Sequence, residues 1–133
     1  MALSAARTAI ERSGVPAAEI GAVIVAGDFN AVRGLKPVRA VQGIAGHPTR
    51  RLAVSDAAHA NGVDRWTWDG RGTPFPSRAI DFLLHSRALI PLQAVVFDSE
   101  TMSADQRAAV GLGPEHFRGL SEHRPVVVDF AWR

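Results

Sequence analysis

Three apolar, strand-like segments that each carry polar groups constrain this chain more than any other feature. Residues 22–26 (Ala-Val-Ile-Val-Ala) run into 27–30 (Gly-Asp-Phe-Asn), residues 79–85 contain Asp81, and residues 121–125 (Ser-Glu-His-Arg-Pro) lead into another apolar run. Polar groups inside or at the tip of a buried strand cost free energy unless they have partners or a chemical role. Three such segments in 133 residues predict one shared active site.

The composition is that of an ordinary globular domain, with 47% hydrophobic and 21% charged residues. The length predicts one domain over residues 1–133. Because the chain has no cysteine, a bound metal must rest on carboxylate, amide or imidazole groups. No apolar run reaches the roughly 18 residues that a membrane span requires. Residues 1–7 show no signal peptide, so we expect a cytoplasmic protein.

The net charge is +2, and Lys36 is the only lysine among the 15 basic residues. Arginine suits phosphate recognition, but the arginines are scattered, with Arg50 and Arg51 the only adjacent pair. An arginine-rich composition without a dedicated nucleic-acid surface is therefore the preferred interpretation. A nucleic-acid-binding domain that stacks bases on Trp66 and Trp68 stays open as an alternative.

Periodicity and turn signals predict the order α-β-α-β-β-β-α-β, an α/β (α+β) pattern with a mixed sheet. Helices are expected at 2–13, over a turn or two at 38–44, at 49–60, and at 103–110 behind a cap at Ser103. Strands are expected at 22–26, 65–68, 79–85, 92–97 and 124–131. The run at 22–26 lacks polar alternation, which predicts a strand covered on both faces.

Asp28 and Asn30 follow the first strand and stand two residues apart. In extended backbone their side chains point the same way, while Phe29 turns into the core. A carboxylate beside an amide can orient a water molecule and hold an anionic oxygen. The alternative is a plain Asp/Asn turn after a strand.

His123 stands between Glu122 and Arg124 just before a strand, which makes it a candidate acid, base or transition-state stabiliser. A surface loop histidine is the alternative. Asp81 lies inside an apolar strand and needs a donor partner, and a histidine ring N–H is a natural one. We predict an Asp81–His123 pair, with a structural contact between Asp81 and Arg78 as the alternative. The other histidines show no metal-ligand pairing and are expected to be structural or surface residues: His47, His59, His85 and His116.

Together these segments resemble the endonuclease/exonuclease/phosphatase family of metal-dependent phosphoesterases. The motifs that carry the resemblance are 27–30 (Gly-Asp-Phe-Asn), 78–82 (Arg-Ala-Ile-Asp-Phe) and 121–126 (Ser-Glu-His-Arg-Pro-Val), with lesser matches at 55–57 and 67–68. They stand in the family's order, and the resemblance runs from about residue 23 to residue 130.

The resemblance implies hydrolysis of a phosphoester substrate, in a nucleic acid or a small phosphodiester, assisted by Mg²⁺ or Mn²⁺. Asp28 would position or deprotonate the attacking water, and Asn30 would hold a phosphate oxygen. His123, oriented by Asp81, would stabilise the transition state. Asp28, Asn30 and Glu122 would bind the metal, although Glu122 replaces the family's usual aspartate with a longer side chain.

The resemblance also implies a partial domain. The family fold is a four-layer α/β-β/α sandwich, and the motif at 27–30 lies near its middle. This chain is therefore expected to form the C-terminal half, one mixed β-sheet with helices on its outer face. The inner face, lined by Val23, Val25, Phe82 and Val127, would lack a covering layer. Truncation of the gene or a misplaced start codon is the preferred explanation, and the alternatives are pairing with a separately encoded N-terminal half, pairing with a second copy, or an exposed apolar patch. Because the main metal-binding glutamate is absent, the isolated chain is expected to be inactive or barely active. A catalytically inactive remnant or interaction module is the alternative.

Overall fold

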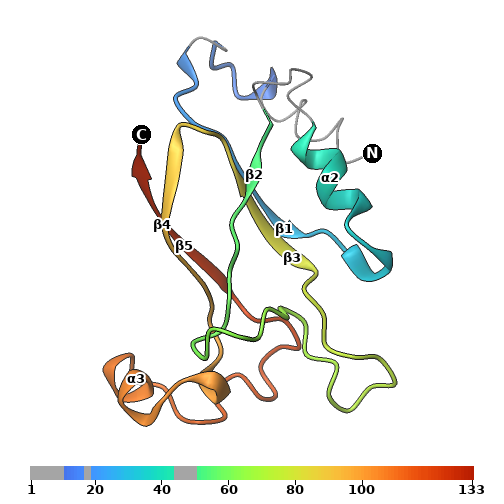
Figure 1. Cartoon of the computed structure of the whole chain (residues 1–133), viewed down its shortest axis with the longest axis vertical. Helices are drawn as coiled ribbons and strands as arrows, with labels where there is room; N and C mark the ends of the chain where they lie inside the picture. Colours follow the sequence, from blue (N-terminus) through green and yellow to red (C-terminus); the bar gives the residue numbers. More distant parts are fainter. Residues whose placement is uncertain (1–10, 17–18, 44–50) are drawn as a thin grey trace.

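The computed structural model describes residues 11–16, 19–43 and 51–133 and shows a mixed α/β arrangement (Figure 1). The strands and helices in chain order are β1 (Ile24–Asp28), α2 (Lys36–Gln42), β2 (Ala53–Val54), β3 (Asp81–His85), β4 (Leu89–Val96), α3 (Ala104–Ala109) and β5 (Val126–Trp132). Two short 3-10 turns, η2 (Ala31–Arg33) and η4 (Ser99–Thr101), precede α2 and α3. No helix in the described part of the chain is long and apolar enough to cross a membrane.

The strands form two small antiparallel sheets, so the expectation of one mixed sheet is wrong. In the first sheet β3 lies between β1 and β2, and in the second sheet β4 pairs with β5. A short turn joins β3 to β4, but β4 finds its partner elsewhere because β1 and β2 already occupy both edges of β3. Among the described residues, parallel pairing is limited to an isolated bridge between Ala58 and Val95.

Helix α2 covers one face of the first sheet (Figure 1). The buried core there consists of Ala31, Val38, Val41, Leu52 and Leu84, with Val23, Val25, Phe29, Val54 and Phe82 packed against it. Phe29 and Phe82 meet edge to face, with ring centroids 5.9 Å apart. The expectation that Val23, Val25 and Phe82 line a bare face is therefore wrong, because these side chains lie under the helix. Val127 of β5 is 49% exposed.

The opposite face of the first sheet is more open. Side chains alternate along a strand, so Ile24, Ala26 and Asp28 of β1 share this face. Their register partners on β3 are His85, Leu83 and Asp81. Ile24 is 52% exposed, so the expectation that this strand is covered on both faces is wrong. Two carboxylates thus lie at one end of a largely apolar strand face.

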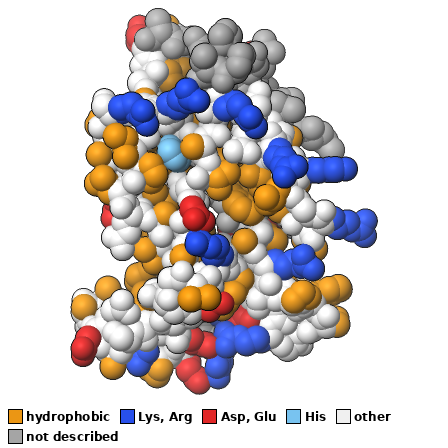
Figure 2. Space-filling model, in the orientation of Figure 1, with side chains coloured by type: hydrophobic (Ala, Val, Ile, Leu, Met, Phe, Trp, Pro, Cys, Tyr) orange, Lys and Arg blue, Asp and Glu red, His pale blue; other side chains and the backbone are white. Residues whose placement is uncertain are grey.

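The second sheet contacts the first through β3 and β5. The rings of His85 and Phe130 lie with centroids 5.1 Å apart, which places His85 in a structural contact. Large apolar side chains of the second sheet stay exposed, with Leu92 and Trp132 each at 69%. In the view of Figure 2, apolar side chains gather over the middle of the molecule, and Lys and Arg side chains line the upper and right-hand edges.

Several predicted elements are confirmed with shifted ends. The strands expected at 22–26, 79–85, 92–97 and 124–131 correspond to β1, β3, β4 and β5, and the helical turn at 38–44 corresponds to α2. The helix expected at 103–110 is α3. Its cap is a full capping box, in which Ser103 accepts from the Gln106 N–H and the Gln106 side chain accepts from the Ser103 N–H.

Two predicted elements are wrong. Of the helix expected at 49–60, residues 51–60 are described, and they form β2 and an irregular segment. Their backbone groups bond to neighbouring strands instead, as when the Ser55 N–H donates to the Leu83 carbonyl. Tertiary pairing thus overrides helix propensity here. The strand expected at 65–68 is reduced to isolated bridges of Trp68 with Arg78 and His123. The N-terminal helix expected at 2–13 lies mostly outside the described residues, apart from the helical Glu11 and Arg12.

Candidate active site

Asp28 and Asp81 lie directly opposite each other on β1 and β3. Because they are register partners in an antiparallel pair, both carboxylates project from the same face of the sheet. Like charges directly opposite each other destabilise a sheet. The pair therefore destabilises the sheet, which makes this end of it a candidate functional site.

The predicted contact between Asp81 and His123 is present. His123 Nδ1 lies 3.0 Å from Asp81 Oδ2 and 3.2 Å from Oδ1. An ionised carboxylate only accepts, so the Nδ1–H donates and Nε2 is left free for chemistry. The side chains are 42% and 19% exposed for His123 and Asp81, so the pair is open to a substrate. The alternative contact is absent among the described residues, because Arg78 donates to the Val32 carbonyl instead.

Asn30 follows Asp28 in a left-handed conformation, with φ 48° and ψ 42°. Asparagine tolerates this region better than most residues. The Asn30 N–H donates to Asp28 Oδ1 at 2.7 Å, which closes a tight turn beyond the strand. The expectation of extended backbone from Asp28 to Asn30 is therefore wrong. The two side chains still belong to one compact turn at the carboxylate end of the sheet.

The Asp81–His123 pair opens into a cavity of about 480 Å³. Its walls come from Ala26 and Leu83 of the open sheet face, from the adjoining Gly27 and Phe82, and from the segment 117–126. Apolar and polar surfaces thus meet at His123. A mostly apolar lining with one polar centre is typical of a ligand pocket.

The Glu122 side chain bonds to Trp68 and lines a different cavity from His123. Its Oε2 accepts from the Trp68 indole N–H at 3.1 Å. It lines a second cavity of about 660 Å³ together with Asp69, Arg71 and Arg118. The segment that carries Glu122 and His123 therefore separates the two cavities. Among the described residues, no three acidic or histidine side chains gather as a ready metal-ligand cluster.

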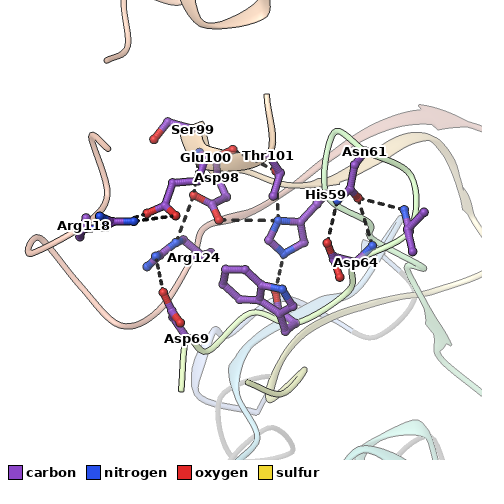
Figure 3. A network of polar contacts seen from close by, with 12 residues as sticks. His59, Asn61, Asp64, Asp69, Asp98, Ser99, Glu100, Thr101, Arg118 and Arg124 are labelled. Carbon is purple, nitrogen blue, oxygen red and sulfur yellow. Dashed lines mark hydrogen bonds and ion pairs between the residues drawn. The ribbon is translucent and has the colours of Figure 1, made fainter. Parts of the chain in front are cut away.

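A buried ionic network, which the sequence analysis missed, anchors the segment around His123 (Figure 3). Arg124 is 3% exposed, and its guanidinium donates to Asp69 Oδ2 at 2.9 Å and to the Ser121 carbonyl at 2.7 Å. Its Nε lies 3.4 Å from Asp98, which is fully buried. The guanidinium also lies over the Trp66 ring, 5.5 Å from the ring centroid. The residue next to His123 is thereby fixed on several sides.

The charges of this network stabilise one another. Arg71 bonds to Asp69 and Glu100, and the hydrogen bonds from Arg71 lower the pKa of Asp69 to about 2, against its desolvation and with added attraction from Arg124. The same arginine lowers the pKa of Glu100, and Asp69 raises the pKa of Arg71 above its usual range. Arg118 adds two bonds to Glu100.

His59 belongs to this network, as expected for a structural histidine. It is 2% exposed, and its Nε2 donates to the Trp66 carbonyl at 2.7 Å. Its Nδ1 lies 3.2 Å from the Thr101 hydroxyl and 3.8 Å from Asp98. The sequence shows two acids, Asp98 and Glu100, and a histidine far upstream, but nothing in it says that they meet. His116 is an exposed residue beside Phe117, and His47 lies outside the described residues.

The model of the Endonuclease/Exonuclease/phosphatase family matches residues 7–103, so the chain belongs to this family. Family membership implies phosphoester substrates, and members typically depend on a metal. The match contains Asp28, Asn30 and Asp81 and ends before His123. No curated protein and no solved structure matches the chain significantly. The placement of His123 against Asp81 therefore rests on the structure alone.

Proposed function

We propose that this chain supplies one side of a metal-dependent phosphoester-hydrolysing site, made of Asp28, Asn30, Asp81 and His123. The observation that carries the proposal is the Asp81–His123 contact at 3.0 Å beside the opposed carboxylate of Asp28. Two acids and a histidine from three distant segments meet at one end of the sheet. Such a meeting costs stability and supports chemistry.

His123 acts through its free Nε2. The carboxylate of Asp81 holds the ring by Nδ1 and favours the charged imidazole. Nε2–H then donates to a non-bridging phosphate oxygen and stabilises the charge that develops in the transition state. Asp81 is the orienting group in this pair.

Asp28 and Asn30 act on the other side of the reacting phosphate. The Asp28 carboxylate accepts a proton from, or orients, the attacking water. Only its Oδ1 has a hydrogen bond among the described residues, from the Asn30 N–H. The Asn30 amide N–H₂ donates to a phosphate oxygen. Because both groups belong to one turn, the water and the phosphate oxygen are held in a fixed relation.

The donor chemistry of the same turn fits Mg²⁺ or Mn²⁺. Hard divalent cations take carboxylate and amide oxygens, and Mg²⁺ is commonly held by one or two carboxylates together with substrate phosphate and water. Asp28 and Asn30 would hold the ion, and a cation there would also offset the repulsion between Asp28 and Asp81. When bound, the ion neutralises phosphate charge and acidifies a water molecule. Glu122 bonds to Trp68, so it is not counted among these ligands.

Two measurements test the proposal. In the first, Mn²⁺ titrated into ¹⁵N-labelled chain should broaden the amide signals of residues 28–30 at substoichiometric amounts, and Asp28→Ala should remove the effect. In the second, hydrolysis of bis-p-nitrophenyl phosphate with Mg²⁺ should be slow, and His123→Ala should reduce it about 10²-fold or more. His116→Ala is the matched control, because His116 is exposed and lies outside the cavity of His123.

A catalytically inactive interaction module is the second candidate. The observation that favours it is the lack of a three-ligand cluster among the described residues, with Glu122 bonded elsewhere. Mn²⁺ broadening without any turnover that depends on His123 would select this candidate. Absence of both effects would overturn the metal-dependent proposal itself.

A further inference from the structure

Thr67 lies where the two segments that build the Asp81–His123 pair come together. It is 2% exposed and takes no part in either cavity. Its hydroxyl oxygen accepts from the Ile80 N–H at 3.0 Å and from the Asp81 N–H at 2.9 Å. One buried oxygen thus fixes the backbone at the residue that carries the orienting carboxylate.

The backbone of Thr67 fixes the other half of the pair. Its carbonyl accepts from the Arg124 N–H at 2.7 Å, directly after His123. Its own N–H donates to the Arg78 carbonyl at 3.0 Å. Every hydrogen-bonding atom of Thr67 except the hydroxyl proton therefore bonds to one of the two segments that carry Asp81 and His123.

The neighbours of Thr67 extend the same connection. Trp68 forms bridges to both Arg78 and His123, and its indole donates to Glu122. The Asp69 N–H donates to the Glu122 carbonyl at 2.7 Å. Asp81 and His123 are 42 residues apart in sequence. The segment 67–69 is hydrogen-bonded to residues 78–81 on one side and to residues 122–124 on the other. A connection of this kind sets the distance between the two side chains.

We propose that Thr67 is a positioning residue, whose hydroxyl and carbonyl together set the Asp81–His123 contact. The inference rests on the proposed role of that pair, but it concerns geometry and not turnover. Loss of the hydroxyl leaves the buried Ile80 N–H and the partly buried Asp81 N–H without an acceptor, so the backbone at Asp81 must move to find water. The carboxylate then no longer meets Nδ1 of His123, and the ring loses its fixed tautomer.

The test uses three variants and two NMR measurements. Thr67→Val keeps the shape and removes the hydroxyl, whereas Thr67→Ser keeps the hydroxyl. Thr73→Val is the matched control, since the Thr73 hydroxyl, like that of Thr67, accepts from a backbone N–H, that of Phe75, but lies away from the pair. The Thr73 hydroxyl in addition donates to the Gly70 carbonyl. Imidazole ¹⁵N shifts report the tautomer of His123, and hydrogen exchange reports the Ile80 and Asp81 amides.

At a pH high enough for the His123 ring to be neutral, we expect the full wild-type chain to show a single Nδ1–H tautomer and slow exchange at both amides. Thr67→Val should give mixed tautomers of His123 and at least about tenfold faster exchange at Asp81. Thr67→Ser and Thr73→Val should match the wild type. A folded Thr67→Val with an unchanged His123 tautomer overturns the inference. If Thr67→Val does not fold, the wild type and Thr67→Ser decide. An Asp81 amide that exchanges in the wild type as fast as an unprotected amide overturns the inference. A protected Asp81 amide, together with a folded Thr67→Ser that matches the wild type, supports it. Neither readout needs metal or substrate, so failure of the proposed activity leaves this test intact.

Discussion

Asp28 and Asp81 are register partners on β1 and β3, so two carboxylates face each other across one strand pair. The partners further along the same face are apolar or aromatic, as with Ala26 opposite Leu83 and Ile24 opposite His85. Apolar pairs stabilise a sheet and like charges destabilise it. At this end of the sheet the proposed chemistry therefore opposes stability, and each can be measured separately.

Removal of one charge of this pair should stabilise the fold. Asp28→Asn keeps an oxygen that can accept from the Asn30 N–H, but it ends the repulsion with Asp81. We expect the free energy of unfolding at neutral pH and low salt to rise by about 0.2–1 kcal/mol. Urea denaturation measures it, and the gain should shrink as salt is added.

Asp129→Asn is the control for this experiment. Asp129 lies on β5 opposite the neutral Gln93, so its removal relieves no repulsion of this kind. We expect a change within about 0.5 kcal/mol. Equal stabilisation by both substitutions would point to overall net charge as the cause and count against the specific Asp28–Asp81 repulsion.

Asp81→Asn should damage the site without damaging the fold. An asparagine amide can donate to Nδ1 of His123, which then carries no proton, so the ring is held in the neutral Nε2–H tautomer and lacks the positive charge that stabilises the transition state. We expect Mg²⁺-dependent phosphodiester hydrolysis to fall about 10²-fold or more. The melting temperature should be almost unchanged, because relief of the repulsion with Asp28 offsets the weakened contact with His123. Asp105→Asn, an exposed change on α3, should keep full activity. Wild-type turnover in Asp81→Asn would show that Asp81 does not orient His123.

The sequence predicted the contact between Asp81 and His123 because their residue types conflict with their surroundings. An aspartate inside an apolar strand and a histidine before a strand are each unusual, so Asp81 and His123 could be paired by chemistry alone. Glu122 could not be placed in the same way. Its direction depends on the Trp68 indole, which bonds to it from a segment 54 residues away in sequence. The left-handed turn at Asn30 likewise depends on a single N–H bond to Asp28.

The fold was predictable where periodicity and local caps decide, as at β3, β5 and the capping box of α3. It was not predictable where long-range pairing decides. Residues 51–60 have helical composition, yet Ser55 and Ala58 give their backbone bonds to Leu83 and to β4. Arg124 shows the same limit, since its two acidic partners lie far away in the chain. Local sequence carries no record of such partners.

Leu84 should be the position at which the first sheet and α2 depend most on packing. It is fully buried in the core cluster, with Val38 and Val41 of the helix. Leu84→Ala should lower the free energy of unfolding by about 2–5 kcal/mol, through lost burial and the cavity left behind. Leu92→Ala is the matched control, because Leu92 is 69% exposed, and it should cost less than about 1 kcal/mol. Equal losses in chemical denaturation would mean that Leu92 is covered in solution.

The acid dependence of stability should reveal the network that anchors Arg124. The pKa of Asp69 is about 2, below its ordinary 3.8, chiefly because Arg71 donates to it. A lowered pKa in the folded state adds stability above the ordinary pKa, and this stability disappears as pH falls from about 4 to about 2. Asp69→Asn should therefore cost about 2 kcal/mol at neutral pH, with the difference from wild type vanishing near pH 2. Asp56→Asn is the control, because its ion pair with Arg65 is exposed and should add less than about 1 kcal/mol. Urea titrations across this pH range measure both, and a loss in Asp69→Asn that stays constant down to pH 2 would show that Asp69 acts through packing and not through its charge.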